Sequence, residues 1–112
     1  MDEPTPLTVS EAIALQDKMV AAVRTCYDPE IPVNIYDLGL IYNVDVDETN
    51  KANIIMTLTS PGCPVADMLV EDVRQAALSV ENVAEVDVEL TFDPAWDKSM
   101  MSEEARLELG FF

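Results

Sequence analysis

The sequence contains no histidine, and this absence removes several common kinds of functional site. There is no histidine for acid–base catalysis, no Cys–His or Ser–His dyad, and no basis for most zinc sites. Only two cysteines are present, Cys26 and Cys63, which are too few for a disulfide scaffold. We expect both thiols to stay reduced in the cytoplasm.

Basic residues are also scarce: six face 22 acidic residues, which gives a formal net charge of −16 at pH 7. Such a chain repels phosphate backbones and anionic lipid surfaces, so we expect it to bind no nucleic acid and no membrane. The sequence has no apolar run of transmembrane length and no secretory leader. We therefore expect a cytoplasmic protein that prefers basic proteins or cations as partners.

The length of 112 residues is sufficient for one domain with its own hydrophobic core. We expect a flexible leader over residues 1–7, which include two prolines, and a single domain over residues 8–112. Thr8 and Glu11 have the spacing of a capping box and precede apolar residues at three- and four-residue intervals. This pattern predicts a helix over residues 9–26.

Apolar and polar residues alternate over residues 40–46, 52–59 and 86–92, which predicts three strands. A turn over residues 48–51 makes the first two an antiparallel hairpin. A second helix, ending near Asn82, separates the second strand from the third, so the third is expected to run parallel to the second.

A last short helix is expected over residues 102–111, with the tail pinned to the body by Trp96, Met100, Met101 and Phe111. Together these elements predict an α+β fold. It is a two-layer α/β sandwich in the order helix-strand-strand-helix-strand-helix, with a three-stranded mixed sheet. Helices are expected on one face of the sheet, and water or a partner on the other.

The segment over residues 27–39 carries two prolines that forbid a regular helix, yet it is too apolar for a flexible linker. We expect an ordered loop that packs on the domain and folds against the turn containing Cys63. Asp28 and Asp37 are expected to accept hydrogen bonds from nearby backbone N–H groups.

The turn after the second strand is the strongest candidate for chemistry, because it places Cys63 at or beside the start of a helix. Free backbone N–H groups and the helix dipole lower the pKa of a thiol there and favour the metal-binding thiolate. From these residues alone, a reactive thiol and a buried, inert cysteine are equally supported. Cys26 lies on the apolar stripe of the first predicted helix, which favours a role in the core.

Three motifs, in this order, give the chain a family resemblance. They are Asp28-Pro29-Glu30-Ile31-Pro32-Val33-Asn34-Ile35-Tyr36-Asp37-Leu38-Gly39-Leu40-Ile41-Tyr42, Thr57-Leu58-Thr59-Ser60-Pro61-Gly62-Cys63-Pro64 and Phe92-Asp93-Pro94-Ala95-Trp96. With them the chain resembles the small iron–sulfur cluster assembly family that includes SufT and PaaD. The resemblance implies a fold similar to iron–sulfur cluster assembly domains. It also implies a non-enzymatic maturation factor that helps to deliver clusters to apo-proteins.

The resemblance also implies roles for particular residues. Cys63 would be the functional thiol and metal ligand, and no residue would be catalytic. The polar residues implied to gather near it are Asp28, Glu30, Asp37, Thr57 and Thr59.

The number of cysteines restricts how a cluster is held, because a cluster usually takes four cysteine ligands. One alternative is a transient iron–sulfur cluster that Cys63 shares with a second protomer in a homodimer, with a partner or with a small thiol. The other is a metal-free adaptor that docks client enzymes. A thiol enzyme is disfavoured, because the chain has neither a resolving cysteine near Cys63 nor a histidine base. The implied partners are the iron–sulfur assembly machinery and apo client proteins.

Overall fold

The computed structural model describes residues 8–27, 31–47, 49–59 and 66–110. Its elements, in chain order, are α1 (Val9–Val23), α2 (Ile35–Leu38), β1 (Ile41–Val46), β2 (Lys51–Met56), α3 (Ala66–Leu78), β3 (Glu85–Leu90), the 3-10 helix η1 (Lys98–Met100) and α4 (Glu103–Leu109). The predicted order is confirmed, with α2 and η1 as additions. The expected leader over residues 1–7 lies outside the described residues.

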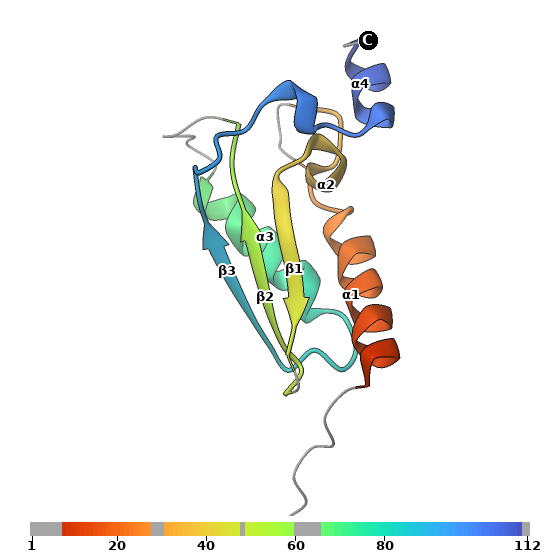
Figure 1. The fold of residues 1–112 in the computed structure, drawn as a ribbon. Helices are drawn as coiled ribbons and strands as arrows, with labels where there is room; N and C mark the ends of the chain where they lie inside the picture. Colours follow the sequence, from red (N-terminus) through yellow and green to blue (C-terminus); the bar gives the residue numbers. More distant parts are fainter. Residues whose placement is uncertain (1–7, 28–30, 48, 60–65, 111–112) are drawn as a thin grey trace, which may run out of the picture.

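The sheet has the order β1-β2-β3, with β1 antiparallel and β3 parallel to β2, as the sequence predicts. Figure 1 shows α3 behind the sheet and α1 beside β1, and α1 packs against both β1 and α3. The predicted α+β fold with a three-stranded mixed sheet is confirmed. In the part of the chain that the structure describes, no helix is long and apolar enough to cross a membrane.

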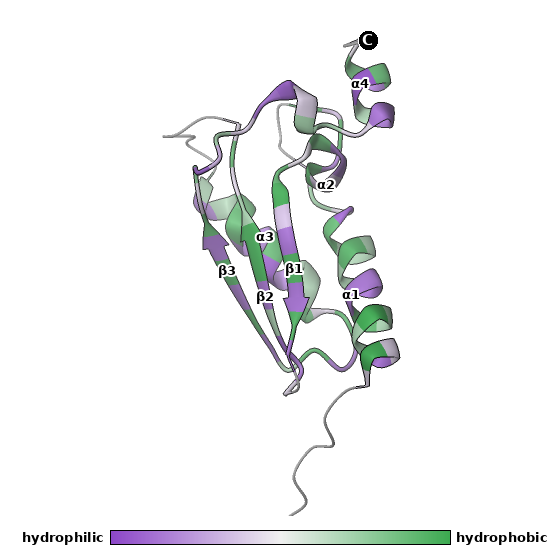
Figure 2. Cartoon of the chain, in the orientation of Figure 1, coloured by the Kyte–Doolittle hydropathy of each residue, from purple (hydrophilic) through white to green (hydrophobic). Residues whose placement is uncertain are grey.

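The central strand β2 supplies the middle of the core, because Ala52, Ile54 and Met56 are all fully buried. Their neighbours Lys51 and Asn53 are exposed on the opposite face. The open face carries exposed polar residues from all three strands: Asn43, Asp45, Lys51, Asn53, Glu85, Asp87 and Glu89. Figure 2 shows polar residues alternating with hydrophobic ones along β3. The predicted division into an apolar and a polar face is confirmed.

The predicted capping box forms at the start of α1. The backbone N–H of Glu11 donates to the Thr8 hydroxyl, and the backbone N–H of Thr8 donates to the Glu11 carboxylate, both at 3.1 Å. The helix ends at Val23, three residues before the predicted end. Cys26 therefore lies beyond the helix, but it is buried and belongs to the core, as predicted.

The segment over residues 27–39 differs from the prediction of a loop without helix, because α2 forms after its second proline. The Asn34 side chain caps α2 by accepting from the N–H of Asp37 at 2.9 Å, and Gly39 ends it with a φ of 90°. The prediction that this segment packs on the domain is confirmed, since Ile35 and Leu38 are buried. Contact with the Cys63 turn falls on residues outside the described part of the chain.

Candidate functional site

The described parts of the three motifs meet at one end of the sheet, where β2 and β3 end and β1 begins (Figure 1). The backbone N–H of Thr57 donates to the carbonyl of Leu40 at 2.8 Å, which joins the second motif to the first. The hydroxyl of Tyr42 donates to the carbonyl of Pro94 at 2.7 Å, which joins the first motif to the third. We call this region the motif end.

The third motif continues into a strap, residues 91–102, which packs against α2 and the start of β1. The strap lies so close to Gly39 that a Cβ atom there would be 2.5 Å from the carbonyl oxygen of Met100. Trp96 donates to the carbonyl of Leu38 at 2.8 Å, and Met101 is buried. The predicted anchoring of the tail by Trp96, Met100 and Met101 is therefore confirmed. The fourth predicted anchor, Phe111, lies outside the described residues.

The carboxylate of Asp37 is held by two side chains. It accepts from Arg24 at 3.2 Å and from the side-chain amide of Asn34 at 2.8 Å, and it is mostly buried. The Arg24 guanidinium also lies 5.1 Å from the ring centroid of Tyr36. Among the described residues these donors are side chains, and not the backbone N–H groups that the sequence led us to expect. The partners of Asp37 fasten the chain after α1 to α2.

The two threonines of the second motif have different surroundings. Thr57 is fully buried, and its hydroxyl donates to the neighbouring carbonyl of Leu58 at 3.5 Å. Thr59 is partly exposed and is the last described residue before the segment that contains Cys63. The structure thus brings Thr57 to the same end of the sheet as α2, which carries Asp37. Cys63, Asp28 and Glu30 lie outside the described residues.

The described cysteine, Cys26, has the surroundings of a structural residue. Its thiol lies 3.6 Å from the carbonyl oxygen of Asp72. Burial, and then the negative charge of Asp72, raise the pKa of the Cys26 thiol, while a hydrogen bond with Thr25 acts in the opposite direction. Asp72 is six residues along α3 from Ala66, roughly 9 Å at the helical rise per residue. Cys26 therefore faces the middle of α3.

The described residues do not form a metal site by themselves. Residues 8–27, 31–47, 49–59 and 66–110 contain no group of three or more cysteine, aspartate or glutamate side chains placed to hold a metal ion. A cluster usually takes four thiolates. The described residues alone therefore do not supply a full set of ligands for a cluster.

A groove, which we call the edge groove, runs along the outer side of β1 to the motif end. Its narrower part, about 290 Å³, is lined by Gln16, Asp17, Val20, Tyr36, Ile41, Tyr42, Asn43 and Val44. Its wider part, about 670 Å³, shares Tyr36, Ile41 and Tyr42 and adds Arg24, Asp37, Gly39, Pro94, Met100 and Ser102. The sequence did not predict that Gln16 and Arg24 line a groove, because no sequence pattern indicates which edge of the sheet α1 will flank.

The comparisons with known proteins agree with the motifs. A profile of a family described as "Iron-sulfur cluster assembly protein" matches residues 16–89. A "Fe-S protein maturation auxiliary factor" of Porphyromonas gingivalis is 56% identical over 102 residues, which are 91% of this chain and 97% of that protein. The "Fe-S protein maturation auxiliary factor SufT" of Staphylococcus aureus is 36% identical over 83 residues, 74% of this chain and 94% of that protein.

One longer relative and one solved structure extend these matches. An "Iron-sulfur cluster carrier protein" of Synechocystis is 27% identical over 84 residues, which are 75% of this chain but only 24% of that protein. The crystal structure of a domain of unknown function, DUF59, from Bacillus anthracis superposes with a TM-score of 0.86 at 39% identity. It covers 94% of this chain and 100% of the other. The neighbour therefore has the same fold over nearly the whole chain.

Proposed function

The chain belongs to the family of iron–sulfur cluster assembly proteins, and we propose that it is a maturation factor that helps to deliver clusters to apo-proteins through Cys63. The relatives from Porphyromonas gingivalis and Staphylococcus aureus are named as maturation auxiliary factors and not as catalysts, which supports a non-enzymatic role in iron–sulfur assembly. The proposed partners are the assembly machinery and apo client proteins in the cytoplasm.

The observation that carries the proposal is the junction of the three motifs at one end of the sheet. Segments from three distant parts of the sequence are joined there by direct hydrogen bonds. Thr59 follows β2 at this end, and Cys63 comes four residues later in the sequence. A rigid base that ends four residues before the proposed functional thiol in the sequence would restrict how a partner and its cargo approach that thiol, which supports a docking and transfer role.

The supply of ligands favours a transient holding of the cargo. Cys26 is buried and faces α3, so Cys63 is the thiol that we propose as the ligand from this chain. The remaining thiolates come from a second protomer, a partner or a small thiol. During delivery the thiolates of the client replace these ligands one at a time, so that each Fe–S bond that breaks is matched by one that forms.

The polar residues of the motifs are proposed to support this site in different ways. Asp37 fixes α2 by its bonds to Arg24 and Asn34, and Thr57 packs in the core at the same end. Thr59, Asp28 and Glu30 are proposed to present polar groups around the cargo. Asp37 and Thr57 would therefore act by positioning the segment that carries Cys63.

The direct test is anaerobic reconstitution of the purified chain with ferrous iron, sulfide and a thiol, followed by visible absorption and measurement of bound iron. We expect a cluster at about one for every two chains, because Cys63 from each of two protomers and two molecules of the added thiol make up four thiolate ligands. The Cys63→Ser variant should bind none, and the Cys26→Ser variant should bind as the parent does. Reconstitution that is independent of Cys63 would disprove the proposal.

A metal-free adaptor that docks client enzymes is the second candidate. The observation in its favour is the open face of the sheet, which is rich in carboxylates in a chain of net charge −16 and suits basic client surfaces. The adaptor predicts no iron binding under reconstitution, together with client binding that survives Cys63→Ser.

A further inference from the structure

We propose that the outer edge of β1 binds an extended, basic segment of a partner protein, which adds to the sheet as a fourth strand in the edge groove. The proposal goes beyond the handling of clusters, because it concerns a surface made of α1 and β1 and uses no thiol. It rests on the backbone of β1, a glutamine of α1 and the charge of the groove.

The outer side of β1 presents backbone groups that the sheet does not use. The carbonyl of Leu40 and the N–H of Asp47 both bond toward β2. Residues that bond inward alternate along an antiparallel strand with residues whose N–H and C=O point outward. The pairing of β1 with β2 is irregular between Ile41 and Asn43 and regular from Asn43 to Val46. Counted back from Asp47, the alternation leaves the backbone N–H and C=O groups of Val44 and Val46 pointing away from β2.

Gln16 on α1 indicates what kind of group this edge accepts. Its side-chain amide donates a hydrogen bond to the carbonyl of Val44. A primary amide has the same N–H donor as a peptide group, so Gln16 makes one of the bonds that a neighbouring strand would make. An incoming strand can take over this bond and add others along the edge.

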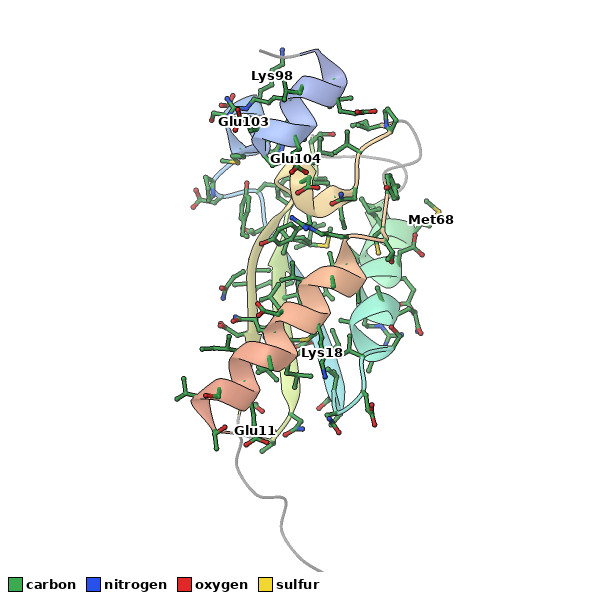
Figure 3. All side chains as sticks on the ribbon, turned by 90° about the vertical axis from the view of Figure 1, so that its right-hand side faces the viewer. Glu11, Lys18, Met68, Lys98, Glu103 and Glu104 are labelled. Atoms are coloured by element: carbon green, nitrogen blue, oxygen red, sulfur yellow. The ribbon has the colours of Figure 1, made fainter. Side chains whose placement is uncertain are left out.

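The face of α1 beside the groove carries exposed apolar side chains. On α1, the exposed residues Val9 (78%) and Ile13 (53%) lie on the same helical face as Gln16 and Val20, at three- and four-residue spacing. Figure 3, which views the molecule from the side of α1, shows this helix crossing in front of the sheet and α3. These apolar side chains can contact one face of an extended segment.

The charge of the groove favours a basic segment. The narrower part is lined by Asp17, and Arg24, the one basic residue in the described lining of the wider part, is already paired with Asp37. The chain as a whole carries a net charge of −16. Lysine or arginine in the segment is therefore attracted both locally and at long range.

The other edge of the sheet is less suited to this pairing. Along β3, Glu85, Asp87 and Glu89 are all exposed and alternate with the apolar residues. A basic segment would meet only these carboxylates on the open face there, whereas beside β1 the helix α1 adds exposed apolar side chains. No helix residue in the described part of the chain bonds to the outer backbone of β3 as Gln16 bonds to β1.

The test titrates the isotope-labelled full chain with a blocked hexapeptide of alternating valine and lysine and follows the backbone amides by NMR. We expect saturable shifts along β1 and slower hydrogen exchange at Val44 and Val46. The amides of Asn43 and Asp45, which pair with β2, should change little. A matched peptide with N-methyl groups on alternate amides lacks the N–H donors along one side of its backbone. It should bind at least tenfold more weakly than the unmethylated peptide.

Two protein variants separate the groove from nonspecific attraction. Ile13→Lys places a positive charge on the face of α1 that carries Gln16 and Val20, beside the groove, and should weaken binding at least fivefold. Leu107→Lys makes the same change at a similarly exposed residue of α4 (56%) and should leave binding unchanged.

Because strand addition depends on the peptide backbone, absence of binding would overturn the proposal. Equal binding of the methylated peptide, or pairing of β1 with a second copy of the chain in sedimentation, would also overturn it. None of these readouts involves iron, so their failure is distinct from failure of the proposed function.

Discussion

The indole N–H of Trp96 donates a hydrogen bond to the carbonyl of Leu38 at 2.8 Å, across 58 positions of sequence. This bond holds the strap against the last residue of α2, beside the glycine that ends the helix. A parallel bond from Tyr42 reaches the carbonyl of Pro94. The motif end is therefore fixed by side-chain donors that reach backbone acceptors on a distant segment.

Removal of either donor should lower stability. Trp96→Phe and Tyr42→Phe keep an aromatic ring but lose the bond, so each should cost about 1 kcal/mol, or roughly 4–8 °C in Tm for a domain of this size. Tyr27→Phe is the control, because Tyr27 is 52% exposed. Thermal melting followed by circular dichroism measures all three. Equal melting temperatures for Tyr42→Phe and Tyr27→Phe would show that the strap bond contributes nothing.

The two glycines at helix ends form a matched pair for a second prediction. Gly39 and Gly110 both have positive φ angles, 90° and 80°, so alanine at either position costs about 1–2 kcal/mol from the backbone alone. Only at Gly39 would the new Cβ also meet a backbone atom, the carbonyl oxygen of Met100, whereas nothing lies within 4 Å at Gly110. Gly39→Ala should therefore lower the free energy of unfolding by clearly more than Gly110→Ala does. Equal losses in urea unfolding would mean that the strap moves away freely.

The sequence predicted most of the fold because its local signals agree with one another. The capping box at Thr8, the alternation along β2 and the crossover helix before β3 each fix one element or its direction. The exception was α2, where two prolines indicated a loop. Asn34 and Gly39 supply both caps of that short helix, and a single turn needs little else.

The candidate site was less accessible from sequence. The motifs predicted which residues belong to it, but their contacts depend on the tertiary arrangement. The bond from Thr57 to Leu40 and the pair of Arg24 with Asp37 join residues whose separation in sequence carries no periodic signal. The edge groove depends likewise on the side of β1 that α1 occupies.

Acid should weaken the fold partly through Glu71. Hydrogen bonds from Arg74, and then from Gln75, lower the pKa of Glu71 from 4.5 to about 2. A lowered pKa in the folded state means that its contribution is present above the unfolded pKa of 4.5 and is lost as the pH falls through about 2. Urea unfolding between pH 2 and pH 5 should show a smaller pH dependence for Glu71→Gln than for the parent.

The Cys26 thiol should be poorly reactive. Because burial raises its pKa above the ordinary value of 9.0, the thiolate is scarce at neutral pH. A raised pKa also means that its contribution to stability is complete below pH 9.0 and declines as the pH rises through the folded value. In the Cys63→Ser protein, iodoacetamide at pH 8 should label Cys26 slowly until urea is added. Rapid labelling of the folded protein would contradict the structural role of Cys26.

The last prediction compares Cys63→Ser with Cys26→Ser. Serine at Cys26 places a hydroxyl in the core, next to the carbonyl of Asp72, and should cost about 1–3 kcal/mol while leaving client maturation largely intact. Serine is favourable near a helix start, where the sequence predicts Cys63, so the melting temperature should change little. Activity of iron–sulfur enzymes in a deletion strain should nevertheless collapse with Cys63→Ser, because the thiolate ligand is lost. Thermal melting of both purified variants beside complementation of the deletion strain makes the comparison. A stable Cys63→Ser protein that restores full enzyme activity would exclude the thiol from the function and leave the metal-free adaptor in its place.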